Sequence, residues 1–364
     1  MKITFLSVSL NMGGGIKVMA IYAQYLISQG HEVNIVSTPI QSKPTLISRL
    51  RNLLRFKFFY PITQKSHFDG LNINNHIIDA FRPIVDADVP DADVVIATWW
   101  ETAEWLDKLS ANKGKKVYFI QGHEVFDFIP KQRAVATYQS NAHKIVVSKW
   151  LKDILEAEYQ TRHLELVPNA IDHKVFYSTN RKKSLIPTIG FLANSGHVKG
   201  LDVALNVVKE LKKDYPTLRV ITFGSSKLKN IPLDAYGIEF HLLPTQDKIR
   251  EIYTHCDVWL APSRSEGFNL TAMEAMACGT PIVSTKTGWP VEAVVPYKNG
   301  ILTEIDDINA LLAGIKWFLS QSDTTWLECS NRVVTATEGY SWEKSAAQFE
   351  SALLKLCHSH PTIN

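Results

Sequence analysis

The sequence lacks the features that mark several classes of protein. It has no apolar run close to the ~18 residues that a membrane-spanning helix needs, and Met1-Lys2 leads straight into a strand pattern instead of a secretion signal. Its net charge of +3 is too small to favour nucleic acid as a partner. We therefore expect a cytoplasmic protein that does not bind nucleic acid.

Cysteine is also scarce. The four cysteines form no CxxC pair, and no cluster of histidine and cysteine has the spacing of a zinc site. Free, buried thiols in a reducing compartment are the interpretation that this pattern favours. The residues are Cys256, Cys278, Cys329 and Cys357.

What the chain does have is the composition of a soluble globular protein, with 45% hydrophobic and 21% charged residues. Its 364 residues are too many for one ordinary core, so two domains are expected. Short continuous apolar runs such as Val94-Val95-Ile96 alternate with helical patterns such as Ile16 to Ser28. Such runs are typical of parallel strands covered on both faces. The fold class is therefore α/β, with two facing Rossmann-like domains, parallel sheets and an interdomain cleft.

The alternation of strand and helix starts afresh after residue 170. A polar, proline-containing connection at 166–172 and an exposed loop at 180–183 separate the two series. We predict an N-terminal domain over 1–172, a second domain over 173–340 and a final helical segment over 341–364. Strands are expected near 2–9, 32–37, 73–78, 93–98, 116–121, 144–148 and 164–167, and then near 187–192, 218–223, 238–242, 257–261, 281–285 and 300–303.

Two glutamates stand out in the second domain. Glu266 follows the strand expected at 257–261, just before a helix, and Glu274 lies within that helix. Open α/β sheets bind ligands at the carboxyl ends of their strands, and Gly267 lets a ligand approach the backbone. The alternative is that the helix dipole favours an acidic residue there, by ~0.3–1 kcal/mol. That alternative accounts for one carboxylate better than for two.

Three further sites follow other strands. Gly13-Gly14-Gly15 opens a helix after the first strand, where backbone N–H groups can meet an anion, although a tight turn without a ligand is equally consistent. Lys199-Gly200 follows the first strand of the second domain and could neutralise a phosphate, or be an ordinary solvated lysine. His123 follows the strand at 116–121 and could act as an acid or base, or bond a nearby carbonyl for structural reasons.

Trp99, Trp100 and Glu124 are candidates for binding a second substrate, an acceptor, if the chain transfers a group. Exposed indoles at a strand end suit stacking on a sugar ring, and packing between domains is the alternative for the two tryptophans. Two Asp-x-Asp sequences, Asp86-Ala87-Asp88 and Asp91-Ala92-Asp93, precede a strand instead of following one. They lie at the amino end of that strand, so we reject a metal site there and expect solvated turns.

Residues 41–67 carry basic side chains and no acid. Apolar residues including Phe58 and Phe59 are interleaved with them. A basic amphipathic helix over 43–65 can contact an anionic membrane surface, and an ordinary surface helix is the equal alternative. The basic residues are Lys43, Arg49, Arg51, Arg55, Lys57 and Lys65.

Taken together, these residues resemble the retaining GT-B glycosyltransferases of family GT4, over almost the whole chain. The specific part is the Glu266-x7-Glu274 spacing followed by Ala275-Met276-Ala277-Cys278-Gly279-Thr280-Pro281. The glycine-rich first loop and Lys199-Gly200 also match but would be weak signals alone. Two further matching parts are Asn299-Gly300 and Tyr340-Ser341-Trp342-Glu343. In this fold the last helix crosses back to the N-terminal domain.

The resemblance implies a role for each matched position. Glu274 would bind the ribose hydroxyls of the donor, Glu266 and His123 would face the donor sugar, and Lys199 would neutralise the diphosphate. Backbone N–H groups of Phe268, Asn269 and Leu270 would hold the sugar and the distal phosphate, beside Gly267. Gly14 and Gly15 would lie near the phosphates and the acceptor.

The sequence departs from the family pattern at two places. Many members have an arginine five residues before the lysine, where this chain has Asn194. Either another cation, such as Arg264 or Lys17, works with Lys199, or phosphate binding is weaker. The family's Gly-Gly-x-Pro-Glu is one residue longer here, as Gly288-Trp289-Pro290-Val291-Glu292, which leaves the role of Glu292 open.

The function that the resemblance implies is retaining, metal-independent transfer of a sugar from a nucleotide diphospho-sugar, without a cofactor. The acceptor would be a glycan or a lipid-linked glycan, in polysaccharide, glycolipid or related cell-envelope synthesis. Two alternatives remain at this point. One is another GT-B enzyme, such as a sugar-nucleotide epimerase or a phosphorylase, and the other is a non-catalytic nucleotide-sugar-binding protein.

Overall fold

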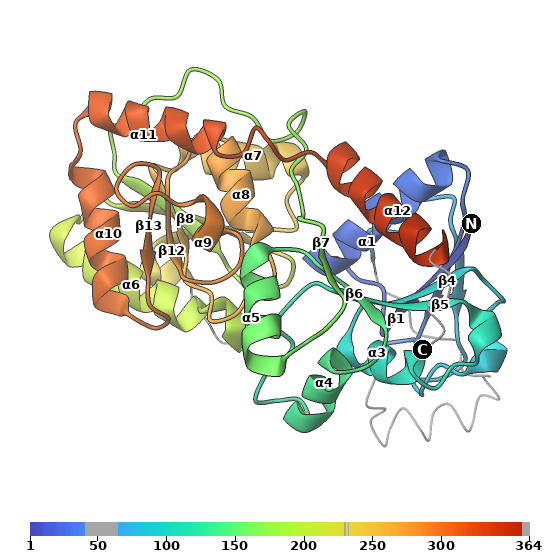
Figure 1. The fold of residues 1–364 in the computed structure, drawn as a ribbon. Helices are drawn as coiled ribbons and strands as arrows, with labels where there is room; N and C mark the ends of the chain where they lie inside the picture. Colours follow the sequence, from blue (N-terminus) through green and yellow to red (C-terminus); the bar gives the residue numbers. More distant parts are fainter. Residues whose placement is uncertain (41–64, 229–230, 232, 359–364) are drawn as a thin grey trace, which may run out of the picture. The chain divides into compact units, whose positions relative to one another are not determined.

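The computed structural model describes residues 1–40, 65–228, 231 and 233–358 (Figure 1). The chain divides into two compact units. Unit 1 comprises Met1–Val147, Lys152–Val167 and Ala346–Asn364, and unit 2 comprises Ser148–Leu151 and Pro168–Ser345. The basic segment predicted to contact membranes lies outside the described residues except for Lys65.

Unit 1 contains, in its described part, a seven-stranded parallel sheet of order β3-β2-β1-β4-β5-β6-β7. Its strands are β1 (Lys2–Ser7), β2 (Glu32–Ser37), β3 (Asn74–Ile77), β4 (Val94–Ala97), β5 (Lys115–Ile120), β6 (His143–Val146) and β7 (Leu164–Leu166). Its helices are α1 (Gly14–Ser28), α3 (Trp100–Leu106), α4 (Lys131–Tyr138) and most of α5 (Lys149–Tyr159) and α12 (Trp342–His358). Central strands such as β4 are buried at every residue, as the continuous apolar runs predict.

The described residues of unit 2 form a six-stranded parallel sheet of order β10-β9-β8-β11-β12-β13. The strands are β8 (Thr188–Leu192), β9 (Arg219–Gly224), β10 (Ile238–Leu242), β11 (Val258–Ala261), β12 (Ile282–Thr285) and β13 (Gly300–Thr303). The helices are α6 (Leu201–Asp214), α7 (Gln246–His255), α8 (Leu270–Ala277), α9 (Pro290–Ala293), α10 (Ile308–Ser320) and α11 (Asp323–Thr335). Helix α6 packs against α10, and α7 and α11 pack against α8 (Figure 1). The prediction of two parallel α/β sheets is confirmed.

The last helix returns to unit 1. Phe349 of α12 is fully buried, and its ring packs against the rings of Phe5, Tyr22 and Phe119. Burying a phenylalanine side chain contributes about 1.5–3 kcal/mol to stability. In Figure 1, α12 lies beside α1, the helix that carries Tyr22. The helix thus completes the core of unit 1 although it follows all of unit 2 in the sequence.

The structure also bears on the predictions about cysteine pairing and about membrane-spanning helices. All four cysteines are free, and three of them are buried. Within the described residues, no helix combines the length and the apolar character needed to cross a membrane.

Candidate active site

The polar residues of the C-terminal half gather where the strands β8, β11 and β12 of unit 2 end. These three strands are neighbours in the order β8-β11-β12. Lys199 closes the 3-10 helix η3 (His197–Lys199) after β8, and Glu266 lies in the loop after β11. Because the strands are parallel, the two loops emerge at the same edge of the sheet.

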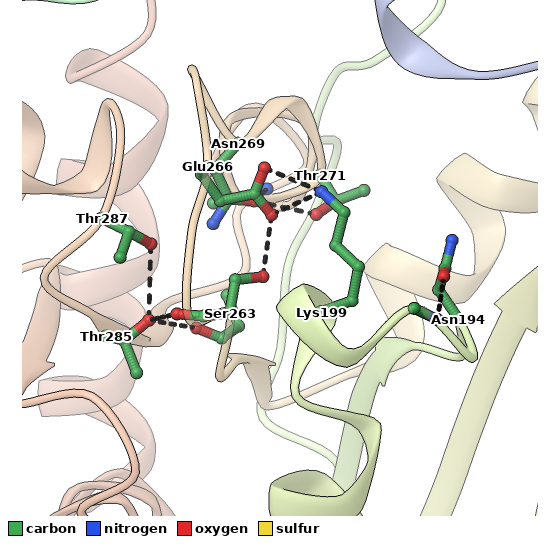
Figure 2. Close-up of polar contacts among 11 residues, drawn as sticks. Asn194, Lys199, Ser263, Glu266, Asn269, Thr271, Thr285 and Thr287 are labelled. Atoms are coloured by element: carbon green, nitrogen blue, oxygen red, sulfur yellow. Dashed lines mark hydrogen bonds and ion pairs between the residues drawn. The ribbon is translucent and has the colours of Figure 1, made fainter. Parts of the chain in front are cut away.

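Lys199 and Glu266 form an ion pair at this edge. The ammonium Nζ lies 2.8 Å from both carboxylate oxygens of Glu266 (Figure 2). The hydroxyl of Ser263 donates a third hydrogen bond, of 2.8 Å, to Oε1 of the same carboxylate. The Glu266 side chain is only 9% exposed, whereas that of Lys199 is 28% exposed. The Lys199 side chain is therefore the more exposed of the two.

Two glycines allow the backbone around Glu266 to pass close to neighbouring turns, because a side chain at either position would collide with that backbone. A Cβ on Gly200 would lie 2.1 Å from the carbonyl oxygen of Pro262, and one on Gly288 would lie 2.8 Å from that of Phe268. Both glycines have positive φ angles, of 65° and 66°. The backbone N–H of Arg264 also donates to the carbonyl of Val198 at 2.8 Å. The lysine turn and the glutamate loop are thus joined through their backbones.

Helix α8 begins at this loop. Asn269 is its N-cap residue, with a left-handed backbone at φ 72°, and its side chain accepts a bond from the Ala272 N–H. Its Oδ1 also accepts from the Thr271 hydroxyl at 3.0 Å (Figure 2). The Nδ2 group of Asn269 is buried and has no acceptor among the described residues. A ligand acceptor at this helix start would satisfy that amide and would lie in the positive field of the helix.

Glu274 lies in the second turn of α8 and is 7% exposed. Its Oε2 accepts a hydrogen bond of 2.9 Å from the hydroxyl of Tyr253. Burial raises the pKa of Tyr253 well above its usual value, and the charge of Glu274 raises it further, so the phenol remains a donor. Tyr253 therefore orients the carboxylate for which the family resemblance implies a ribose-binding role.

Arg264 is already bound by two acids. Its guanidinium donates to both carboxylate oxygens of Asp202, at 2.9 and 2.7 Å, and to Asp306. Hydrogen bonding to Asp202 raises the pKa of Arg264. With two carboxylates around it, this arginine is a poor candidate for the second phosphate cation. Asn194, where the family often has arginine, accepts from the backbone N–H of Gly196 at 2.8 Å and shapes the turn before Lys199 (Figure 2).

Comparison with known proteins gives the context of this geometry. Residues 177–335, which include Lys199, Glu266 and Glu274, match the family described as glycosyl transferases group 1. A D-inositol 3-phosphate glycosyltransferase of Corynebacterium urealyticum is 29% identical over 189 residues, which are 48% of this chain and 43% of that protein. Over residues 177–335 the chain is therefore similar to the group 1 glycosyltransferases. It spans about half the length of the curated relatives it matches.

Solved structures extend the likeness to the whole chain at the level of the fold. Sucrose-phosphate synthase of Thermosynechococcus elongatus superposes with a TM-score of 0.72 at 15% identity, over 98% of this chain and 99% of that chain. The Anabaena protein HepE, solved in complex with UDP and glucose, gives a TM-score of 0.72 at 15% identity, over 97% and 99%. These likenesses show that the chain has the GT-B fold.

The N-terminal half of the chain carries the remaining predicted residues, outside the family match. Gly14 and Gly15 open α1 and are exposed, and Gln121 donates to the carbonyl of Gly15 at 3.1 Å. His123 lies within 2.8 Å of the Tyr159 hydroxyl. Burial lowers the pKa of His123, which favours the neutral imidazole. The glycines are thus exposed at the start of α1, their contact with a ligand stays a prediction, and the histidine lies beside a tyrosine of the same unit.

Two of the acceptor-side residues do not fit their predicted role. Trp100 is 4% exposed, and Arg133 stacks on its ring inside unit 1. Glu124 is 2% exposed, and its Oε2 accepts from the Trp100 N–H and the Tyr118 hydroxyl, both at 2.7 Å. Neither side chain is available to an acceptor, so the prediction of an exposed Trp100 is wrong. Trp99 is half-buried and stacks on Phe126.

Glu292, whose role the sequence leaves open, binds the backbone at the start of α5. Its Oε1 accepts from the backbone N–H groups of Lys149, at 2.7 Å, and Trp150, at 3.3 Å. A carboxylate at the start of α5 is favoured by the dipole of that helix.

Ser148, the residue before α5, donates to the carbonyl of Gly267 at 2.6 Å. Sequence reasoning missed Ser148 because it lies 119 residues away from the loop that it supports.

The two Asp-x-Asp sequences hold no metal-like cluster. Asp88 pairs with Arg82, Asp91 pairs with Lys113, and Asp86 accepts from the Ser110 N–H. Across the described residues, no group of three or more acidic, histidine or cysteine side chains could hold a metal ion.

Proposed function

We propose that this chain transfers a sugar, with retention of configuration, from a nucleotide diphospho-sugar to an acceptor hydroxyl. The observation that carries the proposal is the Lys199–Glu266 ion pair beside the start of α8, within the group 1 match. Lys199 and the positive end of α8 would stabilise the charge that builds on the departing diphosphate. Glu266 would lie at the donor sugar, and Glu274 would bind the ribose.

A donor could contact both Lys199 and Asn269. The charge of Lys199 is balanced by Glu266, and the Nδ2 group of Asn269 has no acceptor among the described residues. A diphosphate would supply acceptors to both groups, in a place partly shielded from water, where such bonds are strongest. The complex of HepE with UDP and glucose is consistent with such a ligand on this fold.

The chemistry would need no metal, since a lysine and a helix start would supply the positive charge. The leaving phosphate would act as the base toward the acceptor hydroxyl, in the front-face attack that the GT4 resemblance implies. The chain would act in the cytoplasm, in the synthesis of a polysaccharide, glycolipid or related glycoconjugate. Contact of the 43–65 segment with an anionic membrane stays a prediction.

A screen of nucleotide sugars tests this proposal. UDP-, GDP-, dTDP- and ADP-sugars are added to the full chain with a chelator present, and the thermal unfolding midpoint is measured. We expect one base to raise the midpoint, and the product of transfer to keep the anomeric configuration of the donor, as read by NMR. Binding without turnover with any acceptor would identify a binding protein. A dependence on added divalent metal would contradict the metal-independent mechanism.

The variants Glu266→Ala and Lys199→Ala test whether the chain transfers a sugar, as opposed to epimerising or only binding a nucleotide sugar. Both should abolish transfer in a chain that still folds, with an unfolding midpoint lowered by the loss of the largely buried ion pair. Lys209→Met, at an exposed lysine of α6, is the matched control and should keep full activity. Epimerised nucleotide sugar as the product, with no glycoside formed, would replace transfer with epimerase chemistry.

A further inference from the structure

Unit 1 has a polar pocket of about 460 Å³ at the carboxyl ends of β1, β2 and β3. This volume lies within the range of about 300–1,000 Å³ typical of small-molecule sites. None of the acceptor-side residues predicted from the sequence lines it. The pocket lies on the other side of β1 from β4, the strand that Trp99 follows.

Hydroxyl and amide groups dominate the polar lining. Ser37 and Ile77 are register partners in neighbouring strands, and Asn75 precedes Ile77 by two residues. Side chains two residues apart in a strand share a face, so these three project from the same face of the sheet. The other hydroxyl groups of the lining belong to Ser9, Thr38 and Ser66.

The hydroxyl group of Ser37, in this lining, lacks a hydrogen bond among the described residues. Its residue is 1% exposed, and its hydroxyl oxygen has no hydrogen-bond partner among the described residues. Buried hydroxyl groups are nearly always hydrogen-bonded in folded proteins, because an unmade bond costs about 1–3 kcal/mol. A polar ligand in the pocket would supply the missing partner.

The described residues of the lining carry no net charge. Among them are one lysine, Lys65, and one aspartate, Asp69, whose formal charges cancel. Asp69 is held by Ser66, whose N–H and hydroxyl both donate to its carboxylate at 3.1 Å. No arginine lines the pocket among the described residues, so the forked donor that best fits a phosphate is missing. Leu10, Pro39, Ile40 and Ile77 add apolar surface.

We propose that this pocket binds the acceptor, and that the acceptor presents a neutral, polyhydroxylated sugar ring there. The inference rests on the proposed function and names the class of its second substrate. Ring hydroxyls would bond Ser37, Asn75 and Asp69, while the C–H faces of the ring would contact the apolar residues. Leu10 also lies next to Asn11, at the start of the glycine-rich loop, which connects the pocket to the first predicted ligand site.

Direct binding of simple sugars to the full chain, without a donor, tests the proposal. Neutral methyl hexosides and N-acetylhexosaminides are titrated at millimolar concentration by saturation-transfer NMR, with hexose 6-phosphates as the charged comparison. We expect a neutral glycoside to bind, and Ser37→Ala and Asn75→Leu each to weaken its binding about 3- to 10-fold, the effect of one lost hydrogen bond. Asn72→Leu makes the same change at an exposed residue outside the pocket, and this control variant should bind the neutral glycoside as tightly as the wild type does.

The outcomes separate this inference from the proposed function. Binding of nucleotide sugars, measured on the same variants, should be unchanged, and transfer assays should show a raised KM for the acceptor with an unchanged KM for the donor. Failure of every neutral glycoside to bind, tighter binding of the phosphorylated sugars, or unchanged binding by both variants would overturn the pocket assignment. Absence of any nucleotide-sugar binding would instead overturn the proposed function.

Discussion

Nζ of Lys199 lies 2.8 Å from both carboxylate oxygens of Glu266, so the proposed phosphate cation and the proposed sugar-facing acid neutralise one another before a donor arrives. The two residues are 67 positions apart and come from loops after neighbouring strands. A diphosphate must therefore share Lys199 with Glu266 or displace it. This competition makes the charge of Glu266 a determinant of nucleotide affinity.

Glu266→Gln should separate affinity from turnover. The glutamine keeps the size of the side chain and can still accept from Ser263, but it no longer neutralises Lys199. We expect UDP, or whichever nucleoside diphosphate binds, to bind about 2- to 5-fold more tightly, the size of a released surface-type ion pair. Turnover should fall by roughly 100-fold if the carboxylate acts at the sugar. Calorimetry and initial rates on one preparation measure both, and weaker nucleotide binding would contradict the competition.

Arg264→Gln distinguishes the two candidate cations. Because Asp202 and Asp306 already hold the guanidinium, its loss should change kcat/KM by less than about 5-fold, whereas Lys199→Met should lower it by roughly 100-fold or more. Steady-state kinetics at saturating acceptor gives both values. Equal losses in the two variants would show that Arg264 leaves its acids and binds the diphosphate.

Much of this arrangement is predictable from the sequence, and the reasons are local. Continuous apolar runs such as Val94–Ala97 locate buried parallel strands, because only side chains covered on both faces can be apolar throughout. The rule that ligands lie at the carboxyl ends of such strands then selects Lys199 and Glu266. No contact has to be known for either step.

What the sequence did not predict depends on contacts between distant segments. Arg264 is neutralised by residues 62 and 42 positions away, and neither spacing marks a pair. Trp100 is buried because α3 begins at that residue, so its side chain turns inward instead of continuing the strand edge. Such outcomes follow from tertiary packing, which residue type and spacing do not contain.

Gly200→Ala should destabilise unit 2 and weaken nucleotide binding. The new Cβ would lie 2.1 Å from the Pro262 carbonyl oxygen, in a backbone with φ 65°. Gly30→Ala is the matched control, since Gly30 also has a positive φ, of 84°, but its Cβ would meet nothing within 4 Å. We expect about 1–2 kcal/mol of destabilisation for the control, from the left-handed backbone alone, and at least ~3 kcal/mol for Gly200→Ala. Urea unfolding measures both, and equal values would refute the clamp on the Glu266 loop.

Glu124 should make stability depend on pH. Burial raises the pKa of Glu124 to about 8, above its ordinary value of 4.5. Because the folded state holds the proton more tightly, stability is greatest below about pH 4.5 as far as this group is concerned and declines as the pH rises toward 8. The decline approaches roughly 5 kcal/mol for a shift of this size. Urea unfolding between pH 5 and pH 9 follows it.

Glu124→Gln should remove most of that dependence. Both donors, the Trp100 N–H and the Tyr118 hydroxyl, point at the same oxygen, Oε2, so one amide oxygen can accept both bonds. The variant should match the wild type near pH 5 and be more stable at pH 9. If the free energy of unfolding depends on pH in the same way in both proteins, then Glu124 is ionised in the folded chain. The prediction that its buried carboxyl group is neutral would then be wrong.

The central claim is that a nucleoside diphosphate binds beside Lys199, and a calorimetric titration tests it most directly. UDP, GDP, dTDP and ADP are titrated into the wild type, Lys199→Met and the control Lys209→Met. The account predicts that at least one nucleotide binds, with affinity about 10- to 100-fold weaker in Lys199→Met, the size of a lost charge-assisted bond, and unchanged in Lys209→Met. Equal affinity in all three proteins, or no binding of any nucleotide to the wild type, would contradict it.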